Sequence, residues 1–348
     1  MSRYLLFASE LYAVPILLPL AAAARARGHA VTWLTSPALA RHLPANEAVI
    51  TTWAGCQSLH ADATFSTVHW LPPQLPGRKI QLFHGLNIDK RDPRKGHFRI
   101  RGLFDLYCTH GPVTTKVFEE LARKHGHFAV CETGWPKLDP LFRNAVPDPA
   151  IVQRAAGRPI VMVASTFTRS LTAAPLILDT LRGLIARGDR YWLLTLHPKS
   201  DPVLLEAYQQ LAGEHAQFMH ADALLDMLRS ADVMVCDTSS AIGEFALLGK
   251  PIVTVRTRVP KPYLIDISDP QQLDAAIARA MQREPELMRA LDAYGQRIHP
   301  ARDGHAAARV IAASEALLAG KWPSLRRKPL NLWRRWRARS KLRAMLRP

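Results

Sequence analysis

The chain has few cysteines, and none of them is arranged as in a metal site or a disulfide framework. Among its 348 residues there are four cysteines, far apart, with no CxxC pair and no histidine at zinc spacing: Cys56, Cys108, Cys131 and Cys236. A chain of this length does not depend on disulfides, and scattered cysteines are typical of reduced thiols. We therefore expect a cytoplasmic protein without a metal, in which Cys236 fills the core from a strand.

Two nucleotide-binding fingerprints are also absent. The sequence contains no GxxxxGK[ST] loop and no GxGxxG turn. The first motif holds the phosphates of a nucleoside triphosphate on backbone N–H groups, and the second holds the pyrophosphate of a dinucleotide. Their absence disfavours a P-loop kinase and an ordinary dehydrogenase, and we expect no cofactor.

No apolar run is long enough to cross a bilayer. The longest candidate, residues 11–24, is broken by prolines and comes directly after Glu10. It lies between two apolar segments, residues 4–8 and 30–34, and Gly28 stands before the second. This order of strand, helix, glycine and strand predicts a βαβ unit rather than a signal peptide.

Acidic residues are missing from the C-terminal end. The chain has a formal net charge of +17, and residues 321–348 contain eleven Lys or Arg and no Asp or Glu, so the remainder carries 17 − 11 = +6. Apolar residues of this tail could line one side of a helix: Leu332, Trp333, Trp336, Leu342, Met345 and Leu346. A basic amphipathic helix with aromatic residues predicts binding to an anionic membrane surface. A disordered basic tail and non-specific nucleic-acid binding are the alternatives.

Short apolar runs alternate with helical patterns along the rest of the chain, which predicts an α/β fold with parallel sheets. Residues 159–164 and 191–196, for example, are predicted strands, and residues 171–187 between them are a predicted helix. The polar, proline-containing stretch 144–157 has the composition of a domain linker. We therefore expect Rossmann-like domains at 1–145 and 155–302, a closing helix at 303–320 and the basic tail at 321–348.

Three polar clusters follow predicted strands, at the sheet edge where α/β proteins bind ligands. They are His84-Gly85, His197-Pro198 and the run Asp237, Thr238, Ser239 and Ser240. The clusters come from both domains, so a cleft between the domains could bring them together. Since a helix follows Ser240, its N–H groups and the three hydroxyls could bind a phosphate. Capping of that helix is the simpler explanation of the hydroxyls.

Other side chains are weaker candidates. Glu244 lies one turn along the same helix and could face a ribose or polyol hydroxyl, or solvent. Thr166 and Arg169 follow another predicted strand and suit phosphate contacts. An ordinary turn rich in Ser and Thr, with no ligand, is the alternative explanation of this segment. In the charged loop after His84, Lys90 is the one phosphate-binding candidate.

His84 and His197 are candidates for acid–base chemistry, because the ordinary pKa of histidine is close to neutral. A lone histidine is more often structural, but here each domain supplies one at a strand end. The residues alone leave the two explanations open.

The ordered set of motifs resembles the CDP-glycerol glycerophosphotransferase family of teichoic-acid and capsule synthesis. The family's Q-x-W-H-G is similar to residues 81–85, its G-Y-P-R-x-D to residues 134–139, and its A-P-T-W/F-R stretch, more loosely, to residues 164–169. Its H-P element matches residues 197–198, its D-x-x-x-x-D-Y-S-S matches 232–240, and a K-P-I follows at 250–252. A late D-G element matches residues 303–304. Phe83 and Thr238 depart from the tryptophan and tyrosine of the family pattern.

The resemblance implies a GT-B fold, two Rossmann-like domains whose parallel sheets face a central cleft, with the acceptor on the N-terminal side and the donor on the C-terminal side. It implies that His84 is the base, that His197 stabilises charge on the pyrophosphate bridge, and that Thr238, Ser239 and Ser240 cradle the pyrophosphate. The implied reaction transfers glycerol phosphate, or another polyol phosphate, from a CDP-linked donor to an envelope glycan or lipid-linked acceptor and releases CMP. Together with the basic tail, a lipid-linked acceptor predicts a peripheral location on the inner face of the cytoplasmic membrane.

Two other functions remain open. Residues 253–258 are similar to those of UDP-N-acetylglucosamine 2-epimerases, which makes a UDP-sugar glycosyltransferase or epimerase the first alternative. A non-catalytic membrane or nucleic-acid binding protein is the second.

Overall fold

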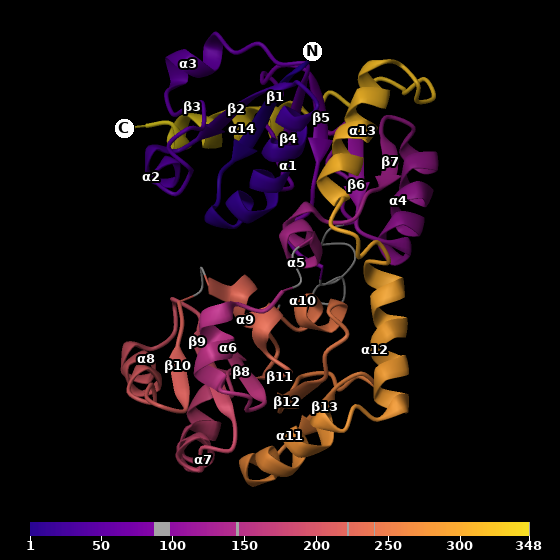
Figure 1. The fold of residues 1–348 in the computed structure, drawn as a ribbon. Helices are drawn as coiled ribbons and strands as arrows, with labels where there is room; N and C mark the ends of the chain where they lie inside the picture. Colours follow the sequence, from indigo (N-terminus) through magenta and orange to yellow (C-terminus); the bar gives the residue numbers. More distant parts are fainter. Residues whose placement is uncertain (87–97, 144–145, 221–222, 240, 348) are drawn as a thin grey trace. The chain divides into compact units, whose positions relative to one another are not determined.

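The computed structural model describes residues 1–86, 98–143, 146–220, 223–239 and 241–347. The chain divides into two compact units (Figure 1). Unit 1 consists of Met1–Arg143 together with Arg297–Pro348, and unit 2 consists of Asn144–Gln296. The last fifty or so residues thus return to the N-terminal unit.

Unit 1 is built on a parallel sheet in the order β3-β2-β1-β4-β5-β6-β7. Its strands are β1 (Arg3–Ala8), β2 (Ala30–Thr35), β3 (Val49–Ile50), β4 (Ala63–Ser66), β5 (Arg78–Gln81), β6 (Leu106–Thr109) and β7 (Ala129–Glu132). Its helices are η1 (Leu11–Ala13), α1 (Val14–Ala26), α2 (Pro37–Ala40), α3 (Trp53–Gln57), α4 (Pro112–His125), η2 (Pro136–Leu138), α5 (Asp139–Arg143), α13 (Ala306–Leu318) and α14 (Leu332–Met345).

Unit 2 repeats the plan with a parallel sheet in the order β10-β9-β8-β11-β12-β13. Its strands are β8 (Ile160–Ser165), β9 (Tyr191–Leu196), β10 (Ala216–Phe218), β11 (Val233–Cys236), β12 (Ile252–Val255) and β13 (Ile265–Ile267). Its helices are α6 (Pro149–Ala155), α7 (Ala174–Ala186), α8 (Pro202–Gln209), α9 (Leu224–Ser230), α10 (Ala241–Leu247), η4 (Pro270–Gln272), α11 (Leu273–Met281) and α12 (Pro285–Ile298), whose end leads back to unit 1. Two parallel α/β sheets are the fold class that the sequence predicted.

The N-terminal stretch forms the predicted βαβ unit. Strand β1 pairs in parallel with β2 along its whole length, and Gly28 takes the left-handed conformation, with φ of 77°, before β2 begins. Glycine adopts this conformation at no steric cost. Within the described part of the chain, no helix combines the length and hydrophobicity that a membrane span requires.

Both faces of the unit 1 sheet are covered. Helices α1 and α13 pack together, and Ser314 of α13 hydrogen-bonds to the hydroxyl of Tyr4, which places them on one face. On the other face, Leu342 and Leu346 at the C-terminal end belong to the same buried cluster as Leu5 and Phe7 of β1. The basic tail is therefore part of the unit 1 core, and the expectation of a separate appendage needs correction.

Polar contacts fasten the tail along its length. The Nζ of Lys328 donates to Asp105 at 2.6 Å, and the backbone N–H of Arg326 donates to the carbonyl oxygen of Gly126. The ammonium group of Lys341 lies 5.2 Å from the ring centroid of Trp70, a cation–π distance. Other residues of the tail are exposed to solvent: Leu332, Trp333 and Trp336 are 71%, 67% and 61% exposed. The apolar side predicted from the sequence is thus divided between core and surface.

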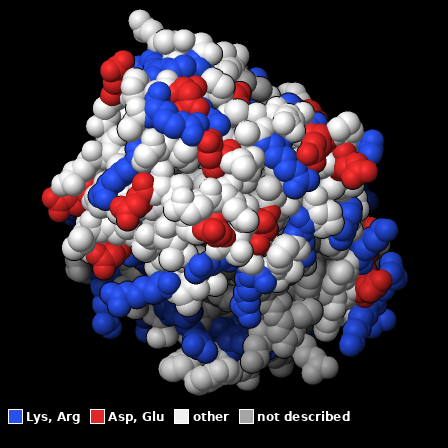
Figure 2. All heavy atoms as spheres, turned by 90° about the horizontal axis from the view of Figure 1, so that it is seen from below, with Lys and Arg blue, Asp and Glu red and all other residues white. Residues whose placement is uncertain are grey.

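Basic residues are also common outside the tail. On the face drawn in Figure 2, basic and acidic side chains are interspersed over the upper part, and basic side chains predominate among the charged ones in the lower part. By sequence, the chain outside residues 321–348 carries a moderate excess of +6.

Candidate active site

His84 lies at the carboxyl edge of the unit 1 sheet, in the loop that follows β5. Its Nδ1 is 3.1 Å from the backbone carbonyl oxygen of Thr67, which follows β4. Because a carbonyl oxygen only accepts hydrogen bonds, Nδ1 carries the proton of the neutral ring and Nε2 carries the lone pair. The adjacent Phe83 is buried, and its carbonyl oxygen accepts a 2.8 Å hydrogen bond from the indole Nε1 of Trp135. The loop thus presents a half-buried histidine with a proton-accepting nitrogen.

Gly85 and Lys90 follow His84. A Cβ added at Gly85 would meet no heavy atom within 4 Å in the described chain, so packing there does not require glycine. Lys90 lies outside the described residues.

His197 holds the equivalent place in unit 2, directly after β9. Its Nδ1 accepts a 3.0 Å hydrogen bond from the backbone N–H of Lys199, so Nε2 carries the proton of the neutral ring. His197 is exposed as a whole, but desolvation of part of its ring and the nearby Lys199 charge lower its pKa, which favours the neutral ring. Its ring centroid lies 4.3 Å from that of Phe167. His197 therefore presents a hydrogen-bond donor, the opposite of His84.

Asp237 has a different position from the one expected of a ligand-binding residue. Its side chain is fully buried and hydrogen-bonds to the hydroxyl of Ser165 and to the backbone N–H groups of Thr166 and Ala173. Burial raises the pKa of its carboxyl group, against the effect of these hydrogen bonds. Asp237 thus joins the end of β11 to the loop after β8, and so it positions Thr166 instead of lying open to a ligand.

Thr238 and Ser239, which follow Asp237, are half-buried. The Oγ of Ser239 accepts a hydrogen bond from the N–H of Ala241 at the start of α10, and the Oγ1 of Thr238 accepts one from the N–H of Arg258. Helix capping, the simpler explanation, therefore does apply to Ser239. Each hydroxyl keeps a proton that it can donate. Ser240 lies outside the described residues.

Arg169 and Glu244 differ strongly in exposure. The side chain of Arg169 is 95% exposed, and its guanidinium lies 3.8 Å from Asp201, so the ion pair holds it weakly. Glu244 is only 4% exposed on α10, which excludes the solvent-facing alternative. Within the described chain, no group of three or more His, Cys, Asp or Glu is placed to hold a metal ion.

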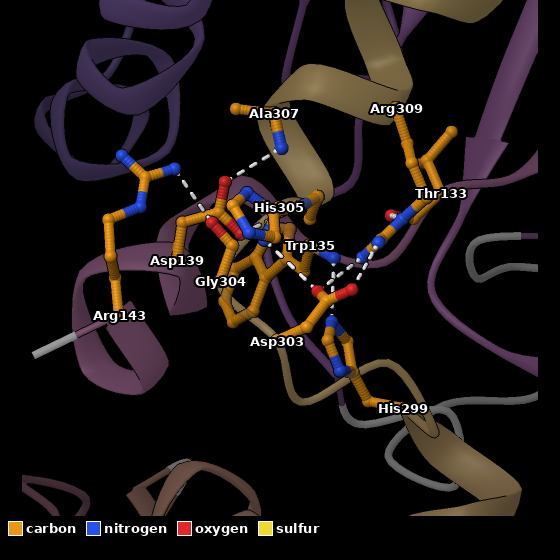
Figure 3. A network of polar contacts seen from close by, with 11 residues as sticks. Thr133, Trp135, Asp139, Arg143, His299, Asp303, Gly304, His305, Ala307 and Arg309 are labelled. Carbon is orange, nitrogen blue, oxygen red and sulfur yellow. Dashed lines mark hydrogen bonds and ion pairs between the residues drawn. The ribbon is translucent and has the colours of Figure 1, made fainter. Parts of the chain in front are cut away.

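The motifs at residues 134–139 and 303–304 meet each other in unit 1 (Figure 3). The carboxylate of Asp139 accepts hydrogen bonds from the N–H groups of Ala306 and Ala307, at 2.8 and 2.7 Å, and so caps α13. Arg143 donates to the carbonyl oxygen of Gly304, and Asp303 pairs with Arg309. These two motifs form a structural joint that holds the returning chain on unit 1.

His299 completes the joint (Figure 3). It is 1% exposed, and its Nε2 accepts a 2.8 Å hydrogen bond from the N–H of Trp135. Gly134 has φ of 79°, and a Cβ there would lie 2.9 Å from the same nitrogen of His299, so both backbone geometry and space favour glycine.

A family model described as CDP-Glycerol:Poly(glycerophosphate) glycerophosphotransferase matches residues 69–258, which is 190 of 348 residues. The chain belongs to this family. Both histidines, the Asp237 run and Lys250-Pro251-Ile252 lie inside the matched range. The expectation of an enzyme of the glycerophosphotransferase type is therefore confirmed. No curated protein sequence matches.

Solved structures give the fold. The wall teichoic acid polymerase TagF aligns with a TM-score of 0.67 at 13% identity, covering 92% of this chain and 90% of TagF. A Listeria monocytogenes protein described as a UDP-N-acetylglucosamine 2-epimerase aligns with a TM-score of 0.66 at 14% identity, covering 93% of this chain and 98% of that protein. The S. aureus MnaA–UDP structure aligns with a TM-score of 0.61 at 14% identity, covering 92% of this chain and 97% of the MnaA chain. At such identities the similarity concerns the fold alone, and the predicted GT-B class is confirmed.

Proposed function

We propose that the protein transfers glycerol phosphate, or another polyol phosphate, from a CDP-linked donor to a hydroxyl of an envelope glycan or lipid-linked acceptor. The observation that carries this proposal is the pair of opposite tautomers, with a proton-accepting Nε2 on His84 and a proton-bearing Nε2 on His197. Phosphoryl transfer to an alcohol needs both functions, because the nucleophile loses a proton while the leaving oxygen gains negative charge.

In the proposed step the acceptor oxygen attacks the phosphorus that bears the glycerol. The new P–O bond forms as the bond from this phosphorus to the bridging oxygen breaks, and CMP leaves with that oxygen. The Nε2 of His84 takes the hydroxyl proton. The Nε2–H of His197 donates a hydrogen bond to the bridging oxygen, which stabilises its developing charge. The step needs no further reactant.

The remaining predicted site residues have supporting roles in this proposal. Thr238, Ser239 and Ser240 donate hydrogen bonds to the pyrophosphate, and Arg169 and Lys90 supply positive charge. Thr166 and Gly85 line the donor and acceptor sides. Glu244 contacts a hydroxyl of the ribose or polyol. Asp237 holds the loop that carries Thr166, as its buried hydrogen bonds indicate.

The test is nucleotide release with matched histidine variants. Purified protein and a bacterial lipid extract are incubated with CDP-glycerol, CDP-ribitol or UDP-sugars. We expect CMP from a CDP-polyol, and a loss of two or more orders of magnitude in His84→Ala and His197→Ala, as is usual for removal of a general base or a charge-stabilising donor. The exposed His42 and His220 serve as controls, one in each unit, and their alanine variants should retain activity. Release of UDP alone would favour the glycosyltransferase or epimerase alternative, and no release would favour a binding protein.

We also propose that the enzyme works on the inner face of the cytoplasmic membrane and binds it through the outward face of the tail, defined as Leu332, Trp333, Trp336, Arg337 and Arg343 of α14 together with Arg347 just after it. The rings of Trp333 and Trp336 stack at 5.1 Å between centroids. Tryptophan favours the membrane interface, and each basic residue near an anionic surface contributes about 1 kcal/mol. Because Leu342 and Leu346 are committed to the core, the helix would bind as a preformed surface on unit 1.

Sedimentation with vesicles tests this surface. We expect binding to phosphatidylglycerol-containing vesicles, weakened by salt, and little binding to pure phosphatidylcholine. The double variant Trp333→Ser/Trp336→Ser should lose binding, whereas Val203→Ser, at a 76% exposed apolar residue of unit 2, should not. Unchanged binding of the double variant would contradict the proposal, and displacement of vesicles by RNA would favour the nucleic-acid alternative.

A further inference from the structure

A second histidine lies beside His84. His69 follows β4, and its ring centroid is 5.2 Å from that of His84, with the two ring planes at 67°. Both side chains are half-buried at the same edge of the unit 1 sheet. On another side of His84 lies the ring of Tyr12, at 5.1 Å between centroids. Burial, with a smaller effect of Glu10, raises the pKa of Tyr12 to about 12, so its hydroxyl stays protonated at neutral pH.

A buried glutamine sets the tautomer of the neutral His69 ring. Gln81 ends β5, its side chain is 1% exposed, and its Nε2 lies 2.8 Å from the Nδ1 of His69. An amide nitrogen only donates, so Nδ1 accepts and the proton of the neutral ring is on Nε2. Gln81 is also the first residue of the segment that ends in His84-Gly85, so one strand end places both histidines.

The two neighbouring rings therefore carry opposite functions. The Nε2 of His84 accepts a proton, and the Nε2–H of His69 donates a hydrogen bond. A vicinal diol fits such a pair, since one of its hydroxyls can donate to His84 while the oxygen of the other accepts from His69. An acceptor with a single isolated hydroxyl could hydrogen-bond to only one of the two rings at a time.

We propose that His69 binds the acceptor and favours acceptors that end in a vicinal diol, and that Gln81 is a positioning residue that sets the tautomer of His69. The inference rests on the proposed function, because it takes His84 as the base. A neutral hydrogen bond contributes about 0.5–1.5 kcal/mol, so the preference for the diol should be about 2- to 12-fold in kcat/KM.

The kinetic test compares two synthetic acceptors, one ending in a 1,2-diol and one lacking the hydroxyl next to the reacting one. The wild type should prefer the diol, and His69→Phe should abolish the preference by lowering kcat/KM for the diol alone, with the KM of the donor unchanged. His42→Ala is the matched control. Equal losses for both acceptors would mean a purely structural role and would overturn the proposal, as would a retained preference.

A second readout does not depend on activity. Nitrogen-15 NMR of histidine-labelled protein should show the proton of His69 on Nε2 and that of His84 on Nδ1. In Gln81→Leu, His69 should shift toward a mixture of tautomers, while His84 keeps its own. A wild-type His69 protonated on Nδ1 overturns the proposal even if transfer is intact. If the tautomers are as stated but the wild type transfers nothing, the proposed function fails, and the acceptor role of His69 fails with it.

Discussion

Replacing Leu342 by alanine should destabilise the protein strongly, although the residue lies in a tail that the sequence alone presents as an appendage. Its side chain is fully buried in the cluster that contains Leu5 and Phe7 of β1. Truncation of a buried leucine costs about 2–5 kcal/mol, because it removes apolar contacts and leaves a cavity. For a folding unit of 150–250 residues, each kcal/mol lowers Tm by roughly 2–4 °C, which gives a drop of about 4–20 °C.

Differential scanning calorimetry and urea unfolding measure this change, and the same helix supplies the control. Leu332→Ala removes the same atoms from a side chain that is 71% exposed, and it should change the free energy of unfolding by no more than about 0.5 kcal/mol. If the two variants are equally stable, α14 does not pack on unit 1 as described, and the account of the outward face fails with it.

Three further predictions concern the joint of Figure 3. Asp139→Asn should lower the free energy of unfolding by about 1–3 kcal/mol. The two carboxylate oxygens of Asp139 accept hydrogen bonds from Ala306 and Ala307 at the start of α13, and the amide of asparagine has only one oxygen that can accept. Urea unfolding measures the change, and an unchanged free energy of unfolding would contradict the capping role. Gly134→Ala should cost about 1–3 kcal/mol through strain at positive φ and crowding against His299, and an unchanged Tm would refute this. Burial lowers the pKa of His299 to about 4, below its value of about 6.5 in the unfolded chain. Because the unfolded chain therefore binds the proton first, the free energy of unfolding should fall as the pH drops from about 6.5 to 4. His299→Gln should flatten that part of the curve of stability against pH, and an unaltered curve would exclude His299 as the cause.

The sequence predicted the strands that are continuous apolar runs. Residues 159–164 were expected where β8 spans Ile160–Ser165, and residues 191–196 coincide with β9. Such runs are typical of parallel strands covered on both faces, so their positions can be recognised without a partner strand. The helix expected at 171–187 is shorter, Ala174–Ala186, which is an ordinary boundary difference.

The region between β2 and β5 was not predicted. Strand β4 has the sequence ATFS and is buried throughout, although its polar residues give it no apolar run. Its β-branched and aromatic residues were the available signal. Because this strand was missed, His69, which follows it, was missed as well.

Contacts between residues that are far apart in the sequence could not be predicted either. Nothing local to Asp237 shows that Ser165 and Ala173 will surround its carboxylate, since they lie 72 and 64 positions away. In the tail, Trp336 and Leu342 were expected on one helical side, yet at about 100° per residue they lie about 120° apart. The structure accordingly buries Leu342 and exposes Trp336.

The most direct test of the central claim is mass spectrometry of the acceptor after incubation with CDP-glycerol, with CMP measured in the same reaction. The account predicts that the acceptor gains whole glycerol phosphate units, with one CMP for each unit added, and that neither product appears with His84→Ala. An acceptor that gains a sugar from a UDP-linked donor, with no glycerol phosphate added from CDP-glycerol, would contradict it.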